Sequence, residues 1–174
     1  MRMNRAVAAG ILLLILENGV VPWLVPSDWS SRLTPHLTFV LLVYVACFAG
    51  RHRAFLFGLG FGLLSDILTY GNLIGPYAFG MGLIGYAAGL VMERSTPTIA
   101  KVIGTAAFGS AAIGTVVYMI YRLFRLTTWS YGFAFYWFIA PTLLLEVLIA
   151  LALYLPARRL LLKPAVSSAE ETAA

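Results

Sequence analysis

Charged residues are scarce in this sequence. Asp, Glu, Lys and Arg make up 11% of its 174 residues, whereas hydrophobic residues make up 61%. Soluble domains contain about 25% charged and roughly 45–50% apolar residues. A chain of this length has too few polar groups to cover a globule in water, so the composition excludes an ordinary soluble domain. It predicts a membrane protein whose surface is covered by lipid.

The sequence contains a single cysteine and none of the common catalytic motifs. Cys47 is the only cysteine, which excludes a disulfide framework and a cysteine-based metal site. The sequence has no GxxxxGK phosphate loop, no HExxH zinc motif and no GxSxG nucleophile elbow. His36 and His52 are expected at opposite membrane edges, as solvated loop residues that share no site. We therefore expect a protein that is not an enzyme and that uses no cofactor and no metal.

The net charge of +5 does not indicate a nucleic-acid partner. The 12 Lys and Arg residues fall in short clusters between apolar runs rather than along one face. This pattern is typical of loops that follow the positive-inside rule, and no nucleic-acid-binding motif accompanies it. We expect membrane lipid, and not nucleic acid, around this chain.

Six apolar runs approach the roughly 20 residues that a transmembrane helix requires. They cover about residues 6–25, 35–50, 54–70, 73–92, 99–121 and 133–155. Pro35 is expected to open the second helix, residues 51–53 to form a basic turn, and Pro141 to kink the last helix. No cleavage site follows the first run, so it is expected to remain as a helix. The sequence thus predicts an all-α membrane protein: a single bundle of about six transmembrane helices over residues 1–163, with a disordered cytoplasmic tail over 164–174.

The basic residues predict the orientation of this bundle. With six spans and a cytoplasmic N-terminus, the outer side holds only three of them: Arg32, Arg122 and Arg125. The cytoplasmic side holds the other nine: Arg2, Arg5, Arg51, Arg53, Arg94, Lys101, Arg158, Arg159 and Lys163. This bias predicts that both termini are cytoplasmic.

Residues 58–89 are rich in glycine, with nine of the sixteen glycines of the chain. Gly58 and Gly62 are four residues apart, as are Gly85 and Gly89, a spacing that lets two membrane helices approach closely. Asp66 continues the first row, because residues 58, 62 and 66 of a helix lie within about 80° of one another. We expect Asp66 to face a packed helix rather than lipid.

Three acidic residues, Glu17, Asp66 and Glu146, lie inside predicted spans. Each charge costs about 2.5–3.5 kcal/mol at a helix centre on insertion scales, so each requires a reason to be there. One interpretation is functional: a proton or ion relay, a ligand contact, or a bond to a partner helix. The other is structural, a carboxyl that joins two helices of the bundle. For Asp66 the structural interpretation is bonding to free backbone N–H groups where the fourth helix starts, just before Pro76.

The same segment resembles the rod-shape-determining MreD family. The resemblance rests on Gly-Leu-Leu-Ser-Asp-Ile-Leu at 62–68, Gly-Asn-Leu-Ile-Gly-Pro-Tyr-Ala at 71–78 and Gly-Tyr-Ala-Ala-Gly at 85–89. The flanks agree, with Glu17 in the first helix, Pro35 before the second and Ala140-Pro141 in the last.

The resemblance implies a non-catalytic scaffold of the bacterial elongasome, in the inner (cytoplasmic) membrane, that helps to control cell shape and peptidoglycan elongation. Its implied partner is MreC and, indirectly, RodA, a class B penicillin-binding protein and MreB. Candidate helix-packing or partner-binding residues are Gly58, Gly62, Asp66, Gly75, Pro76, Gly85, Gly89, Glu17 and Glu146.

The family is also similar in fold to the substrate-binding S components of energy-coupling-factor vitamin transporters, which provides an alternative function. Ala6 and Gly10 form a small-xxx-small pair that such a subunit could use for docking. An S component would require polar ligand-binding side chains that converge in the outer half, where the candidates are Asp66, Asn72 and Tyr77. An integral membrane enzyme is a third possibility, which the missing motifs disfavour.

Overall fold

In the computed structural model, residues 3–24, 35–69, 73–93 and 98–161 are described, and every element within them is helical. The elements in chain order are α1 (Met3–Gly19), α2 (Val21–Leu24), α3 (Leu37–Ala49), α4 (Arg51–Leu68), α5 (Pro76–Glu93), α6 (Ile99–Leu123), α7 (Tyr131–Ala134), the π-helix η1 (Phe135–Ile139) and α8 (Ala140–Leu161). The predicted tail over 164–174 lies outside the described residues.

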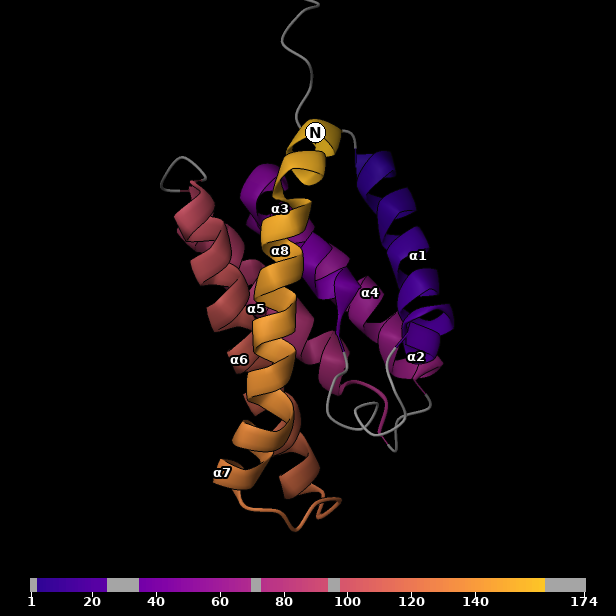
Figure 1. The fold of residues 1–174 in the computed structure, drawn as a ribbon, viewed down its shortest axis with the longest axis vertical. Helices are drawn as coiled ribbons and strands as arrows, with labels where there is room; N and C mark the ends of the chain where they lie inside the picture. Colours follow the sequence, from indigo (N-terminus) through magenta and orange to yellow (C-terminus); the bar gives the residue numbers. More distant parts are fainter. Residues whose placement is uncertain (1–2, 25–34, 70–72, 94–97, 162–174) are drawn as a thin grey trace, which may run out of the picture.

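Six helices of 13 or more residues, α1, α3, α4, α5, α6 and α8, alternate in direction along the chain (Figure 1). Helix α1 begins and α8 ends at the same end of the bundle, at the top of the view. Helices α3 and α5 begin toward the opposite end, and α6 and α8 extend beyond them in that direction. The described part of the chain therefore forms one bundle.

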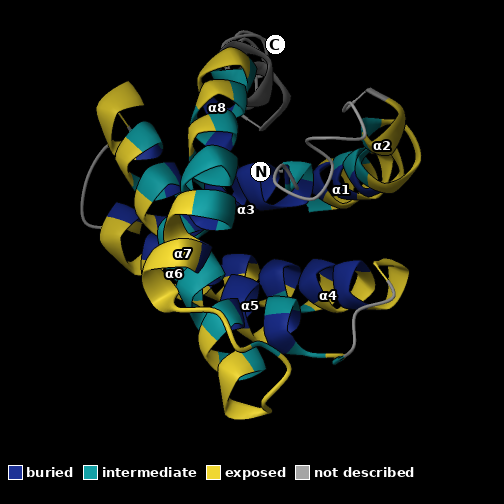
Figure 2. Cartoon of the chain, turned by 60° about the horizontal axis from the view of Figure 1, so that its bottom comes forward, coloured by how far each residue is buried: buried dark blue, intermediate teal, exposed yellow. Residues whose placement is uncertain are grey.

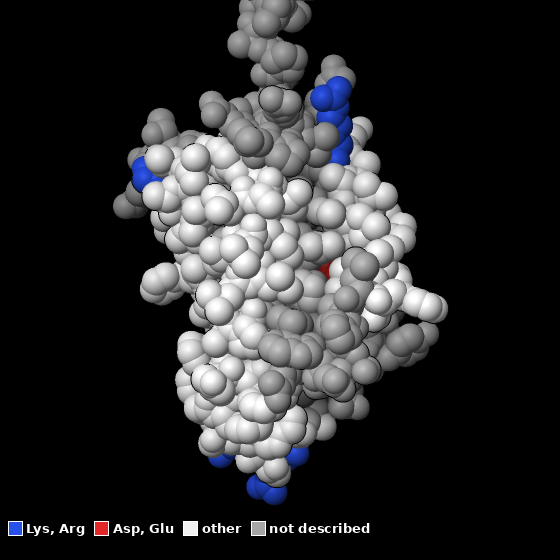
Figure 3. Space-filling view, viewed as in Figure 1, with Lys and Arg blue, Asp and Glu red and all other residues white. Residues whose placement is uncertain are grey.

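The length and surface of the helices identify a membrane protein. Within the described ranges, three stretches are long and apolar enough to cross a membrane: Met3–Trp23, Ile99–Leu123 and Tyr131–Tyr154. Helix α3 is apolar but shorter. Lys and Arg side chains lie at the two ends of the molecule, and the face between them is uncharged except for a small acidic patch (Figure 3). The prediction of an all-α membrane protein is confirmed.

Several predicted helix boundaries are wrong by a few residues. Helix α3 begins at Leu37 and not at Pro35, and α5 begins at Pro76, three residues later than predicted. The basic residues 51–53 are the first turn of α4 rather than a separate turn. Gly50 redirects the chain before them with a φ of +85°, a conformation that glycine adopts without strain.

The first and last helices are also less regular than predicted. Helix α1 ends at Gly19, and the short α2 follows it, where one helix to residue 25 was expected. In the last helix the π-helix Phe135–Ile139 ends two residues before Pro141, where a kink was predicted. Proline has no N–H to donate to the carbonyl four residues earlier, and such a gap favours a locally wider turn.

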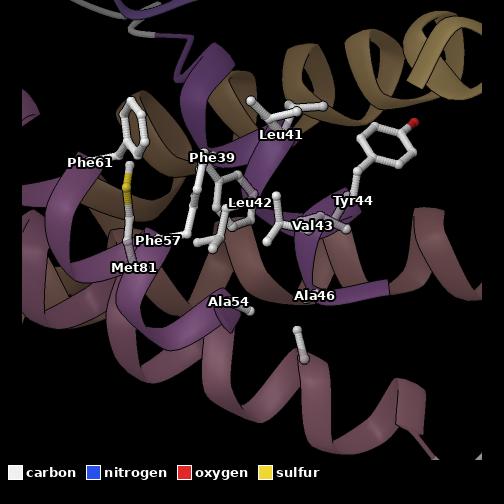
Figure 4. Packing of buried hydrophobic residues seen from close by; sticks show 14 of the residues in the cluster. Phe39, Leu41, Leu42, Val43, Tyr44, Ala46, Ala54, Phe57, Phe61 and Met81 are labelled. Carbon is white, nitrogen blue, oxygen red and sulfur yellow. The ribbon is translucent and has the colours of Figure 1, made fainter. Parts of the chain in front are cut away.

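Helix α3 is the centre of the core. Every residue from Thr38 to Ala46 is buried, and the helix contacts α1, α4, α5, α6 and α8. In Figure 2 it lies behind α8 and is buried, while α6 and α7 carry exposed residues. Its side chains pack with Phe57 and Phe61 of α4 and with Met81 of α5 (Figure 4). A helix that is apolar on all sides is expected in such a central position.

Helices α4 and α5 approach each other most closely at glycines. A Cβ atom on Gly62 would lie 2.6 Å from the Ala78 Cα, and one on Gly85 would lie 2.8 Å from the Ala54 carbonyl oxygen. Added Cβ atoms would similarly overlap backbone of the facing helix at the other members of the two predicted pairs, Gly58 and Gly89. Both glycine pairs therefore lie in one interface, and each lets the facing backbone approach.

Candidate functional site

Asp66 joins the last turns of α4 to the start of α5. Its Oδ2 accepts hydrogen bonds from the backbone N–H groups of Gly75 and Ala78, both at 3.0 Å, and its Oδ1 accepts one from Tyr77 at 3.2 Å. The first N–H groups of a helix have no partner within the helix, and a carboxylate is well suited to bind them. With 4% of its surface exposed, Asp66 uses both oxygens inside the protein. Asp66 therefore binds free backbone N–H groups at the start of the next helix, as the structural interpretation of this residue predicts.

Glu17 of α1 binds the start of α3 as Asp66 of α4 binds the start of α5. From the last turn of α1, its Oε2 accepts hydrogen bonds from the Thr38 backbone N–H at 3.2 Å and from the Thr38 hydroxyl at 3.0 Å. Its Oε1 lies 2.9 Å from the His36 Nδ1. Glu17 therefore also uses both oxygens inside the bundle, and it ties α1 to α3.

His36 connects the acidic residues. Its Nε2 lies 3.2 Å from the Tyr77 hydroxyl, and the two rings contact each other with centroids 4.7 Å apart. Its backbone N–H donates to the Glu146 Oε1 at 3.2 Å. A continuous path of hydrogen bonds and covalent bonds thus runs from Asp66 through Tyr77 and His36 to both glutamates.

The prediction that His36 is a solvated loop residue is therefore wrong. Its side chain is only 12% exposed, and both ring nitrogens have partners. The sequence does carry a relevant signal, because His36 lies directly before an apolar helix in a chain with three intramembrane acids. His52, by contrast, is exposed at the start of α4, next to Tyr86.

Glu146 differs from the other two acids. It lies on α8 and is 2% exposed, and its Oε1 accepts the His36 N–H. The Ser110 hydroxyl of α6 borders the same carboxyl. Its Oε2 is buried and has no hydrogen-bond partner among the described residues. A buried polar atom without a partner is uncommon in native structures and requires an explanation.

Glu146 and His36 line a cavity of about 580 Å³ between α3, α5, α6, η1, α8 and the segment that follows α6. Its polar lining includes Tyr77, Ser110 and Thr142. Its remaining walls are mainly aromatic and aliphatic, and they include Phe39, Met81, Ile113, Val117, Tyr118, Tyr121, Leu126, Trp129, Phe138 and Ile139.

The predicted site residues therefore divide into two groups. Gly58, Gly62, Gly85 and Gly89 form the α4–α5 interface, whereas Glu17, Asp66 and Glu146 meet around His36 and Tyr77. Gly75 and Pro76 lie where α5 begins, beside Asp66. Asn72 lies outside the described residues. The described residues contain no group of three or more His, Cys, Asp or Glu side chains that could hold a metal.

The fold and the site together define a helical membrane protein whose intramembrane acids bind the starts of its own helices. The family model described as rod shape-determining protein MreD matches residues 1–163, and the chain belongs to this family. No curated protein and no solved structure matches the chain. The similarity to S components remains a prediction.

Proposed function

We propose that this chain is a non-catalytic membrane scaffold of cell-wall elongation that binds MreC and, through it, RodA, a class B penicillin-binding protein and MreB. The observation that carries the proposal is the family match over residues 1–163, since this family acts in rod-shape determination. The geometry supports it, because Asp66 and Glu17 use their oxygens to hold helices together. Such carboxyls stabilise one arrangement of the bundle for a partner to recognise.

We further propose six spans with both termini in the cytoplasm. The alternating directions of the six long helices support the number, and the excess of basic residues at the cytoplasmic loops supports the orientation. Reporter fusions at residues 31, 52, 96, 129 and the C-terminus should report outside, inside, inside, outside and inside. A C-terminus on the outer side would contradict this topology.

Affinity purification tests the scaffold proposal. The tagged full-length chain is extracted from its native membranes with a mild detergent, and the proteins that co-purify are identified by mass spectrometry. We expect an MreC homologue, and we expect it to be lost when the MreC membrane helix is replaced by an unrelated one. Co-purification of a transporter ATPase module without MreC would contradict the scaffold.

The cavity favours a second candidate, the S component of an energy-coupling-factor transporter. Polar side chains converge in it to a greater extent than the sequence indicates, because His36, Ser110, Thr142 and Glu146 add to Tyr77. An S component would bind a vitamin and would purify with the ATPase module, so the same purification distinguishes the two functions.

A further inference from the structure

The three buried acids differ in how many of their oxygens have partners. Asp66 and Glu17 each receive three hydrogen bonds or polar contacts on two oxygens. Glu146 receives the His36 N–H on one oxygen, and its other oxygen has no partner in the described part of the chain. The free oxygen belongs to the one acid that lines the cavity.

The cluster also contains more acidic side chains than basic ones. The His36 ring contacts Glu17 at 2.9 Å and Tyr77 at 3.2 Å, so neither ring nitrogen is available to Glu146. None of the Lys and Arg side chains in the described part of the chain lines the cavity. An isolated buried carboxylate is strongly unfavourable unless a positive or hydrogen-bond-donating group binds it. Among the described residues no donor reaches the Glu146 Oε2, although the Ser110 hydroxyl borders the same carboxyl.

The walls of the cavity indicate which kind of donor fits. Aromatic side chains, among them Tyr118, Tyr121, Trp129 and Phe138, line it together with aliphatic residues. Aromatic faces attract organic cations, and the attraction increases where water is excluded. A volume of about 580 Å³ lies within the range of roughly 300–1,000 Å³ that is usual for small-molecule sites.

The aromatic wall of the cavity around Trp129 and Phe138 is held in place by hydrogen bonds and ring stacking. The Trp129 carbonyl accepts hydrogen bonds from the Tyr118 hydroxyl and from the Arg122 guanidinium, both at 2.8 Å. The Trp129 ring stacks on Phe138 at 5.1 Å between centroids. Phe138 lies in the π-helix η1, and π-turns frequently occur at functional sites. The aromatic wall is thus preorganised rather than a loose loop.

We propose that this cavity binds a primary ammonium group attached to an apolar body, with the ammonium on the Glu146 Oε2 and the apolar body against the aromatic wall. The proposal is independent of the scaffold function, because an MreC-binding protein and a transporter subunit could both carry such a site. Two sources share this chemistry. One is the headgroup of an ethanolamine lipid from the surrounding membrane, and the other is a soluble aromatic or aliphatic amine.

Three probes with the same indole body test the proposal: tryptamine, which carries an ammonium, tryptophol, which carries a hydroxyl, and indole-3-propionate, which carries a carboxylate. Their affinities are measured by isothermal titration calorimetry on the full-length protein in phosphatidylglycerol nanodiscs. We expect tryptamine to bind at least tenfold more tightly than tryptophol, and the carboxylate to bind more weakly than either.

Two variants locate the site. Glu146→Gln should remove the preference for tryptamine, whereas the matched change Glu93→Gln, at an exposed carboxylate next to Arg51, should keep it. Thr142→Phe fills the cavity without changing a charge and should weaken tryptamine and tryptophol alike. Thermal unfolding identifies the variants that are folded. If Glu146→Gln does not fold, Thr142→Phe still tests whether the probes bind in this cavity.

Nanodiscs that contain phosphatidylethanolamine separate the two sources. Weaker apparent tryptamine affinity there, compared with phosphatidylglycerol alone, identifies the lipid headgroup as the occupant, and unchanged affinity identifies a soluble amine. Equal affinity of the folded wild-type protein for the three probes would overturn the proposal. So would the absence of binding by any of them, or a tryptamine preference that survives in folded Glu146→Gln and Thr142→Phe proteins.

Discussion

Replacing Gly62 with alanine tests the α4–α5 interface with a single methyl group. The new Cβ would lie 2.6 Å from the Ala78 Cα, 2.7 Å from the Tyr77 carbonyl oxygen and 2.8 Å from the Ala78 nitrogen. These are backbone atoms, which cannot turn away as the end of a side chain can. Helix α5 must therefore shift, and its first turn is the part that Asp66 binds through the Ala78 N–H.

A matched control isolates this steric cost. Gly60 lies on the same helix, is exposed, and would place a Cβ with nothing within 4 Å. Both substitutions gain about 0.5–1 kcal/mol of helix propensity, because alanine loses less backbone entropy than glycine. The difference between the two variants is therefore the cost of overpacking, about 1–3 kcal/mol. Gly60→Ala should be neutral or stabilising, and Gly62→Ala should be destabilising.

The assay is thermal unfolding of both variants and the wild type in one detergent, followed by circular dichroism and by the fraction that remains monodisperse. We expect the midpoint to fall for Gly62→Ala and to stay level or rise for Gly60→Ala. Leucine at 62 should be worse than alanine, because a branched side chain meets the same backbone. Equal midpoints for the two alanine variants would refute the close approach of α4 and α5.

Three further substitutions test the polar cluster by the same unfolding measurement. Asp66→Asn leaves one acceptor oxygen for three backbone N–H donors and should lower the midpoint, and Asp66→Leu should lower it further; an equal loss in both would contradict the capping role. Glu17→Ala leaves His36 Nδ1 and the Thr38 N–H without their acceptor and should cost about 1–3 kcal/mol, and a wild-type midpoint would show that neither needs one. Tyr77→Phe removes the 3.2 Å contact with the His36 Nε2 and should lower the free energy of unfolding by less than about 1 kcal/mol. A larger loss of stability than in Glu17→Ala would show that the tyrosine, and not the glutamate, is the main support of His36.

The sequence predicts those parts of the fold that depend on local pattern. Six apolar runs correspond to the six main helices, because the length and hydropathy of a run are properties of neighbouring residues. The glycine spacing in 58–89 indicates the α4–α5 contact for a similar reason, since Gly58 and Gly62 repeat on one face of one helix. Asp66 faces α5 for the same reason, because it lies on the same face of α4 as Gly58 and Gly62.

The parts that sequence reasoning missed depend on distant partners. His36 lies 110 residues from Glu146 and 41 from Tyr77, so no local spacing could indicate that it is buried. The start of α3 at Leu37 is set by where Glu17 can reach the Thr38 N–H, which depends on the packing of α1. The cavity escaped prediction because α3, α5, α6, η1, α8 and the segment after α6 all contribute to it.

The short length of α3 offers one cause for most of these features. Its 13 residues rise about 20 Å, whereas the hydrocarbon core of a bilayer is about 30 Å thick. The first N–H groups of the helix therefore lie within the bundle, where side chains bind them. Glu17 and Glu146 do so at α3, as Asp66 does at α5.

The cavity adjoins the start of α3, where His36 and Phe39 line it. Helix α6, with 25 residues, and α8 continue past the start of α3 and line the cavity as well. An isolated acid in an apolar run, together with a second run that is too short to cross a membrane, is therefore a sequence signal for a helix that starts within the bundle. On this reasoning, two of the acids serve the fold alone. Glu146, which binds the start of α3 with one oxygen and lines the adjoining cavity, is the acid through which the fold provides a binding site.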